Sequence, residues 1–411
     1  MPSIGRRLPR FRLLLALFTF ALLAALGGYV GWSRWQTSEL LRRGEEALEA
    51  RNDDVAREQF ERYLTARPND PRGRLLAARA ARRLHLYAEA WEHLRLGRAN
   101  AIEMEPLDVE EALIDLQLGN EQSIEFLRQR TKTEDDTSRS ILEVLIQHDL
   151  NTYQLWQALD DYTLYLKARP DDLLALLGRG FVWERFLYFS DALLDYRHAV
   201  ASHPDSEQAH LKLANTLLIV GTPDEAEQHY RWLEGVRPNR LEVLLGLARC
   251  SRKLGRTAEA ARRFDDILAK APDQGEALWE RGEVEMILGN AAAAEVLLKK
   301  AVGRLPFDRR VHYAMYRCLL QLDRPKEAEV ANARVAQLDA DLKRLNEIRQ
   351  AVLKQPSDAA LRCEGGLIFL RNGERAEGIH WLQYALRIDP GNEAARTALA
   401  KASEGHAKLP R

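Results

Sequence analysis

The sequence predicts an all-α fold, a superhelical solenoid of antiparallel helix pairs, and two regularities support this prediction. Prolines recur 34 residues apart, and an alanine lies twelve residues before each of them (Pro204, Pro238, Pro272 and Pro306; Ala192, Ala226, Ala260 and Ala294). A fixed period of this length is typical of stacked copies of one supersecondary unit. Within each period, apolar residues fall at helical spacing in two runs. Each unit is therefore expected to be a pair of helices.

The residues between the two runs fit this interpretation. Gly221, Gly255 and Gly289 come just after the first helix of a pair, where the end of a helix favours glycine. Each proline follows a second helix, which cannot continue through it. The first helices also carry small residues that would let the two helices of a pair approach closely (Gly180, Ala214, Ala248 and Gly282). We interpret these small residues as packing contacts and not as chemistry.

The full pattern resembles the tetratricopeptide repeat family. Each copy has a small residue in its first helix, often a glycine after it, then an alanine, an aromatic residue and a closing proline, all in phase (the aromatic residues are Tyr196, Tyr230 and Phe264). The resemblance implies a right-handed superhelix in which the first helices line a concave face. Repeats of this family act as platforms for protein–protein interaction, so the same role is expected here.

The N-terminus has a different character. Residues 1–12 contain four arginines and are predicted to form a basic cytoplasmic tail, followed by an uncharged apolar run over residues 13–32. About 20 residues form a helix of roughly 30 Å, the thickness of a bilayer's hydrocarbon core. This run predicts a single transmembrane helix, with Trp32 and Trp35 near the interface. A signal peptide cleaved near Ala25 to Gly27 is the alternative interpretation.

The arginines also predict the topology. Positive residues tend to stay in the cytoplasm, which places the N-terminus there and the repeats in the periplasm or another extracytoplasmic space. Arg34, Arg42 and Arg43 on the far side of the run weaken this bias. The expected localisation is a single-pass protein of the bacterial inner (cytoplasmic) membrane.

The repeats are expected to run over residues 37–308. Carried backward at the same period, the phase reaches Pro170 and Pro68, but the copies around residues 71–172 are degenerate. Ile102 replaces the expected proline, and Ile124 replaces the expected alanine. Between Arg98 and Arg128 the sequence has acidic residues and no lysine or arginine. That stretch is either a patch for a basic partner or a solvated helical face.

The 34-residue period is interrupted after Pro306. Pro356 follows by 50 residues, so residues 309–356 form an irregular repeat whose extra length is predicted to lie in a long helix over 326–354. Near-heptad apolar residues on this helix suggest two alternatives, a homodimeric coiled coil or packing along the solenoid (Val335, Leu338, Leu342, Leu345 and Val352). Residues 357–411 are predicted to contain a final repeat, a capping helix over 392–403 and a tail.

Composition and motifs give no indication of catalysis. The formal net charge of -1 offers no basic field for nucleic acid, which is an unlikely class of partner on this ground. The sequence has no zinc-peptidase histidine pair, phosphate-binding glycine loop or serine elbow. Cys250, Cys318 and Cys363 are far apart and are expected to be buried thiols. We therefore predict a protein that is not an enzyme and has no cofactor or metal.

The resemblance implies that fixed positions of the first helices point into the groove. In this sequence they form a mixed polar and aromatic lining for a peptide or protein partner (Phe181, Glu184, Asn215, Arg249, Arg252, Trp279, Glu283, Tyr313 and Arg317). The arginines either bind an acidic segment or pair with Glu283 across the groove. Leu211 and Gly246 replace the lysine and asparagine of the family's carboxylate clamp, which argues against a C-terminal acidic peptide as ligand.

These observations predict a membrane-anchored scaffold that assembles or tethers a complex at the cell envelope. The alternative is a non-catalytic subunit of an envelope enzyme or export system, such as one for polysaccharide export or cytochrome maturation, where the family also occurs. Framework residues specify the fold, whereas the groove specifies the partner, so the sequence does not name that partner.

Overall fold

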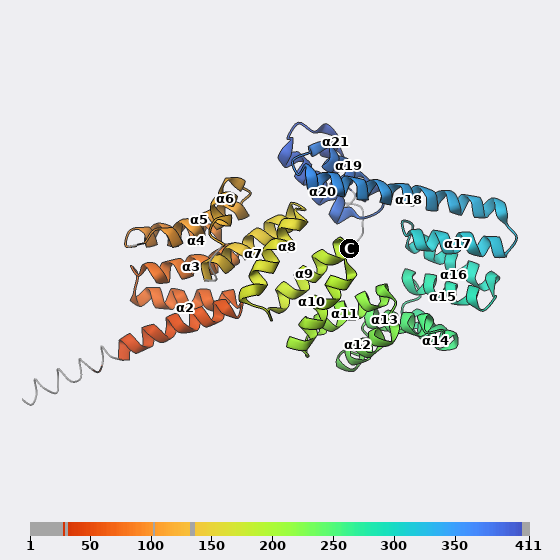
Figure 1. The fold of residues 1–411 in the computed structure, drawn as a ribbon, viewed down its shortest axis with the longest axis horizontal. Helices are drawn as coiled ribbons and strands as arrows, with labels where there is room; N and C mark the ends of the chain where they lie inside the picture. Colours follow the sequence, from red (N-terminus) through yellow and green to blue (C-terminus); the bar gives the residue numbers. More distant parts are fainter. Residues whose placement is uncertain (1–27, 29–31, 102, 132–135, 405–411) are drawn as a thin grey trace, which may run out of the picture. The chain divides into compact units, whose positions relative to one another are not determined.

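The computed structural model describes residues 28, 32–101, 103–131 and 136–404, and this part of the chain consists of helices and their connections (Figure 1). Except for Gly28 and Trp32, the predicted membrane span lies outside the described residues, as does the basic tail. Among the described helices, none is both long enough and apolar enough to cross a bilayer. The chain divides into two compact units, Met1–His148 and Asp149–Arg411, and each is described by itself.

Unit 1 contains successive helix pairs that become irregular toward its end. A helix over residues 32–49 is followed in order by α2 (Asp53–Ala66), α3 (Pro71–Arg83), α4 (Tyr87–Arg98), α5 (Glu105–Gln117), the 3-10 turn η1 (Glu121–Ser123), α6 (Ile124–Arg128) and α7 (Asp136–Asn151), which continues past the boundary. The second helix of the copy that starts at Glu105 is therefore reduced to the short α6. This is the copy in which Ile124 replaces the alanine of the repeat pattern.

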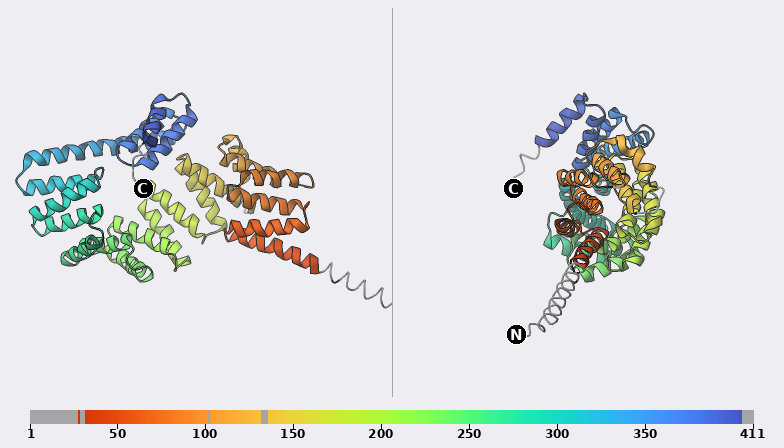
Figure 2. Two further views of the ribbon diagram at one scale, coloured as in Figure 1. Left: turned by 180° about the vertical axis from the view of Figure 1, so that it is seen from behind. Right: turned by 90° about the vertical axis from the view of Figure 1, so that its left-hand side faces the viewer.

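Unit 2 continues as regular helix pairs (Figure 2). They are α8 (Leu155–Ala168), α9 (Leu173–Arg185), α10 (Phe189–Ser202), α11 (Glu207–Val220), α12 (Pro223–Val236), α13 (Leu241–Lys253), α14 (Thr257–Lys270), α15 (Gly275–Ile287), α16 (Ala291–Arg304), α17 (Arg309–Gln321), α18 (Pro325–Lys354), α19 (Ala359–Arg371), α20 (Arg375–Ile388) and α21 (Glu393–Glu404). Each helix packs mainly on its neighbours in sequence, which confirms the predicted stacking of antiparallel pairs.

A left-handed backbone residue marks the repeat phase. Gly119, Gly221, Gly255 and Gly289 have positive φ, with values of 95°, 88°, 72° and 81°. The same 34-residue step also reaches residues that have side chains (Arg51, His85, Tyr153, Leu187 and Asp323). The turn after each first helix therefore keeps its geometry where the sequence has lost its glycine. The recurrence of these turns confirms that the 34-residue phase extends backward into the degenerate copies.

The small residues of the first helices are packing positions, as predicted. A Cβ built on Gly180 would lie 2.4 Å from a ring carbon of Tyr196, and one on Gly44 would lie 2.4 Å from the ring of Phe60. Both rings are fully buried. Two helices of a pair can approach this closely because one of them has no side chain at the contact. The cysteines Cys250, Cys318 and Cys363 are also buried, as expected.

The long helix α18 has the bounds that the sequence indicates. Four of its five near-heptad residues are buried within the chain, and Leu342 is 50% exposed. This burial is what packing along the solenoid requires. The homodimer through 326–354 stays a prediction, because the buried near-heptad residues are not exposed to pair with a second chain. The predicted capping helix is α21, which buries Ala395 and Ala398 against the last pair.

The acidic stretch between Arg98 and Arg128 is partly neutralised inside unit 1. Glu110 is 1% exposed and forms ion pairs with Arg82 and Arg79 of α3. Arg98 pairs with Asp108 at 2.7 Å and also with Glu111. Because a buried carboxylate needs such partners, part of this stretch has a structural role.

Candidate functional site

The candidate groove lies on the first helices of unit 2. Helices α9, α11, α13, α15 and α17 neighbour one another in that order, and α9, α11 and α13 lie on the inner side of the curve in Figure 1, with α10, α12 and α14 outside them. The nine predicted groove residues lie on these five first helices. The repeat geometry therefore brings residues that are about 34 positions apart onto one surface.

A cavity of about 690 Å³ is hollowed into this surface between α11 and α17. Four predicted residues line it, namely Asn215, Arg249, Arg252 and Trp279. The rest of the lining was not predicted (Leu218, Ile219, Tyr230, Leu241, Glu242, Leu245, Lys253, Glu276, Glu280 and Arg310). We call this cavity the central cavity.

The arginines of the central cavity are already paired with carboxylates. Arg249 contacts Glu276 and Glu280 of α15, each at 2.9 Å, and Arg252 contacts Glu280 at 2.8 Å. Burial by itself would lower the pKa of Arg249, but these two carboxylates outweigh it and raise the pKa, so the guanidinium stays charged. Glu280 is 2% exposed, so its buried carboxylate needs the two arginines, which are themselves partly exposed.

The predicted pairing with Glu283 holds for one arginine only. Arg317 contacts Glu283 at 3.3 Å, whereas Arg249 and Arg252 contact Glu280, about one turn earlier on the same helix. Carboxylates recur along α15 at helical spacing, so the correct partner depends on how far α13 is rotated against α15. The spacing of these carboxylates was present in the sequence, but it did not show which turn of α15 carries the partner of each arginine.

Apolar side chains form the open part of the central cavity. Ile219 is 58% exposed and Leu241 is 41% exposed, while Trp279 is 8% exposed and lies deeper. The guanidinium of Arg310 lies over the Trp279 ring at 4.4 Å. Such a stack keeps the ring edge fixed and places a cation beside it. The cavity thus combines an apolar rim with paired charges around it.

The other five predicted residues surround the central cavity without lining it. Phe181 is 41% exposed and lies beneath the ammonium of Lys212, at 5.3 Å. Glu184 accepts a hydrogen bond from Thr216 at 2.7 Å. Tyr313 is 42% exposed. Together with the Arg317–Glu283 pair, these residues extend the surface along α9, α11, α15 and α17.

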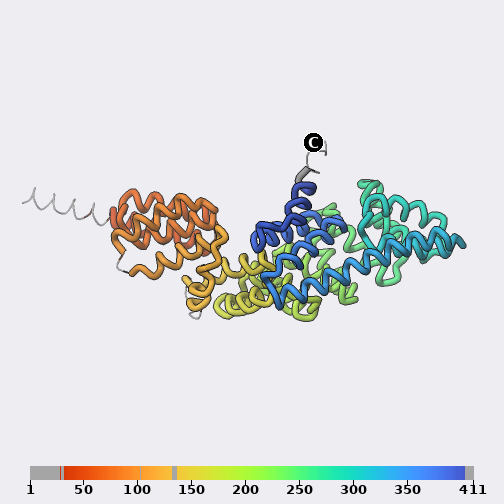
Figure 3. Tube along the Cα trace, turned by 90° about the horizontal axis from the view of Figure 1, so that it is seen from above, coloured from red at the N-terminus to blue at the C-terminus, as the bar shows by residue number. Residues whose placement is uncertain are grey.

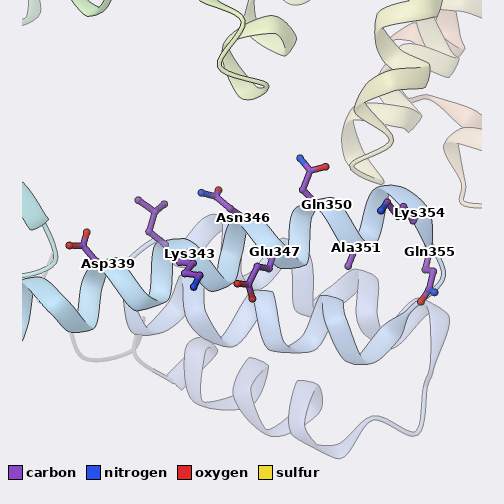
Figure 4. A pocket seen from close by; sticks show the side chains of 9 residues that line it. Asp339, Lys343, Asn346, Glu347, Gln350, Ala351, Lys354 and Gln355 are labelled. Atoms are coloured by element: carbon purple, nitrogen blue, oxygen red, sulfur yellow. The ribbon is translucent and has the colours of Figure 1, made fainter.

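Two further hollows are found in unit 2. One, of about 580 Å³, adjoins the central cavity and shares Asn215 and Glu242 with it. The other, of about 840 Å³, runs along α18 from Asp339 to Gln355. In Figure 4, Asn346 and Gln350 point away from the C-terminal helices drawn below α18. All three hollows have polar groups at their borders.

One cluster in unit 1 has the composition of a metal site but not its chemistry. Ligand atoms of Glu61, Glu89 and His93 lie within 4.8 Å of one another. However, Arg57 donates two hydrogen bonds to Glu89, at 2.6 and 2.8 Å, and Arg74 contacts Nδ1 of His93 at 3.0 Å. The positive charges of Arg57 and Arg74 therefore lie beside the candidate ligands and would repel a metal cation. We interpret the cluster as a structural ion network.

The comparisons with known proteins identify the repeat. A tetratricopeptide repeat model matches residues 212–262 and 245–309. No curated protein matches the chain. Among solved structures, PilW, described as a widely conserved type IV pilus biogenesis factor, is 21% identical, with 51% of this chain and 96% of that chain covered and a TM-score of 0.42.

Two other solved structures are similar. A tetratricopeptide repeat protein from Parabacteroides merdae ATCC 43184 is 17% identical, with 69% of this chain and 98% of that chain covered and a TM-score of 0.37. YrrB, described as a tetratricopeptide repeat protein with an unusual peptide-binding site, is 18% identical, with 47% and 97% covered and a TM-score of 0.38. These scores carry no functional argument. The tetratricopeptide repeat model matches residues 212–309, and the antiparallel helix pairs of unit 2 stack over this stretch as such repeats do.

Proposed function

We propose that the protein is an envelope scaffold that takes an extended segment of a partner protein into the groove of unit 2. The central cavity is the observation that carries this proposal, because it opens at residues that the repeat pattern already assigned to the groove. Its volume of about 690 Å³ lies within the range of about 300–1,000 Å³ that is common for ligand pockets.

The lining indicates the chemistry of the segment. Because Arg249 and Arg252 are held by Glu276 and Glu280, the cavity does not offer an unpaired cationic cluster to a strongly acidic peptide. Its exposed apolar rim instead suits one apolar side chain as an anchor. Charged residues of both signs beside that anchor would match the paired groups around it.

The proposed tether is the apolar run over residues 13–32, preceded by its arginines. It would hold the repeats at the inner membrane, with the N-terminus in the cytoplasm and the repeats outside it. The length and composition of the run support this part of the proposal.

Site-specific photocrosslinking in cells tests the groove. A photoreactive residue at position 219 is expected to crosslink one discrete partner, because Ile219 lies on the rim of the central cavity. The matched control is position 296, because Val296 is also 58% exposed but lies on α16, which contributes no residue to that cavity. Equal crosslinking from both positions, or none from position 219, would refute the groove as the recognition surface.

A pair of charge substitutions complements this experiment. With the photoreactive residue kept at position 219, Leu241→Lys should reduce the crosslinked partner about tenfold, since a lysine at the rim must be desolvated when the segment binds. Val296→Lys should leave it unchanged. Charge reversal at Arg249 is a poorer probe, because it would deprive the buried Glu280 of a partner and destabilise the fold.

The tether is tested with a chain that lacks residues 1–36. If the proposal is correct, this chain fractionates away from the membrane, while purified partner still binds to it. Retention at the membrane would contradict the proposed anchor, and loss of binding in solution would place recognition in the N-terminal segment.

A further inference from the structure

The two ends of unit 2 are joined by contacts between residues about 200 positions apart. Nε2 of His380 donates to the backbone oxygen of Asn151 at 2.5 Å, and Arg362 donates to the backbone oxygen of Thr152 at 2.9 Å. The rings of Tyr153 and Trp381 meet edge to face at 5.2 Å. We call this set of contacts, with the Arg185 contacts described below, the clasp.

The centre of the clasp is buried. Arg362 is 2% exposed, Trp381 is 1% exposed and Thr152 is 1% exposed. The guanidinium of Arg362 also donates to the backbone oxygen of Pro356 at 2.9 Å and lies over the Tyr384 ring at 4.0 Å. A buried cation is tolerated when carbonyl oxygens and aromatic faces surround it in this way.

The outer part of the clasp is polar and partly exposed. Arg185 of α9 donates to the hydroxyl of Tyr153 at 3.2 Å and to Glu377 of α20 at 3.4 Å. Glu377 in turn accepts a hydrogen bond from the indole of Trp381 at 3.3 Å. Exposed ion pairs of this kind are weak, so this layer closes the clasp without making it permanent.

Tyr153 lies in the turn between α7 and α8 and has a left-handed backbone. Its φ is 61°, at the repeat position where Gly119 and Gly221 have positive φ at little cost. The ring of Tyr153 contacts both Trp381 and Arg185, so it joins the buried and the polar parts of the clasp.

The clasp closes a loop of repeats. Helix α18 has 30 residues, roughly 45 Å at 1.5 Å per residue, and Figure 3 shows it as one continuous rod that leads to α19–α21. The extra length in the sequence therefore returns the chain to α8 and α9. Helices α9, α11 and α13 lie on the inner side of the curve in Figure 1, so this part of the groove faces the inside of the loop.

We propose that the clasp is a gate on the groove, and this inference rests on the proposed function. In a solenoid each repeat contacts only its neighbours, so the stacking of the repeats does not by itself hold the two ends together. The clasp holds the two ends of unit 2 together. A partner segment with a folded domain on each side cannot be threaded through the closed loop, so it enters the groove when the clasp opens. Partner association is therefore limited by opening of the clasp.

The first measurement is independent of any partner. Gln157 of α8 and Ala376 of α20 are both exposed, and spin labels on cysteines placed at these two positions report the distance between the ends by double electron–electron resonance. Arg185→Ala with His380→Ala should broaden and lengthen this distance. The matched control is Arg197→Ala with His198→Ala on α10, which removes the same side-chain types from exposed ion pairs and should leave the distance unchanged.

The second measurement uses the photocrosslink from position 219 as its readout. In the Arg185→Ala, His380→Ala chain, the partner crosslink should form severalfold faster after the partner is added, and in the α10 control it should form at the rate of the unmodified chain. A distance distribution that stays narrow and short would refute the clasp as the closure. An altered distance with an unchanged crosslinking rate would refute the gate and leave the proposed groove standing.

The two proposals fail in different ways. If even the unmodified chain gives no crosslink from position 219, the proposed function is wrong, and a gate on that groove falls with it. If the crosslink forms but is slower in the clasp variant, the closed clasp completes the binding surface, which also overturns the gate.

Discussion

Gly180→Ala tests the packing of the repeats most directly. The missing side chain at Gly180 lets α9 approach the buried ring of Tyr196 on α10, and a Cβ there would lie 2.4, 2.8 and 3.0 Å from three ring carbons. Tyr196 is fully buried, so its ring has little room to move. Overpacking of this kind costs about 1–3 kcal/mol, while replacing glycine by alanine within a helix gains about 0.5–1 kcal/mol. The expected net effect is a loss of about 1–2 kcal/mol.

The control has the opposite expected sign. Gly303 lies in α16, and a Cβ there would meet nothing within 4 Å, so Gly303→Ala should stabilise the protein by up to about 1 kcal/mol. Urea unfolding followed by circular dichroism measures both variants. The urea midpoints are compared only between variants whose unfolding curves have the same slope, because long repeat arrays depart from two-state behaviour.

A third variant isolates the contact itself. Tyr196→Leu removes the ring, and in that background Gly180→Ala should become neutral or stabilising, which gives a coupling energy of about 1–3 kcal/mol. If Gly180→Ala raises the midpoint of the unmodified chain as Gly303→Ala does, the close approach of α9 and α10 is wrong, and so is the assigned phase of the repeats.

Three further predictions concern stability. Ala226→Leu should cost about 1–3 kcal/mol by overpacking a position that is 0% exposed, and a wild-type melting curve would contradict the register. Asp172→Ala should cost about 1 kcal/mol, because Asp172 caps α9 through the amide of Ala175 at 2.9 Å, and Asp172→Asn should retain most of the stability. Burial lowers the pKa of both His210 and His229, which meet Nδ1 to Nδ1 at 3.0 Å, so the free energy of unfolding should be intact above about pH 6.5 and should fall as the pH drops toward the lower folded-state pKa values. In urea titrations across this range, His210→Phe should flatten the pH dependence, and an unchanged slope would exclude this pair as its source.

The repeat period was predictable because it depends on local sequence. A positive φ after each first helix and a small residue against a ring are features formed within one or two repeats. The bounds of α18 and the capping role of α21 followed from the same rules of helix periodicity. Even the degenerate copies kept this geometry, with Tyr153 and Leu187 at positions where glycine is usual.

The pairing within the groove was predictable only in part. That residues such as Arg249 and Trp279 share one surface follows from the period. The choice of Glu280 over Glu283 as a partner does not, because it depends on a rotation between neighbouring helices of less than one turn. The apolar rim at Ile219 and Leu241 was missed because neither residue occupies a fixed groove position of the repeat.

The sequence by itself determined the repeat unit, its phase and the location of the 16-residue insertion, because each of these is encoded over distances shorter than about two repeats. Only the tertiary structure decided that Arg362 and His380 meet Thr152 and Asn151. Such a meeting depends on the small rotations between successive repeats, which add up over the whole array. No local pattern records their sum, and so the contact between the two ends of unit 2 became visible only in three dimensions.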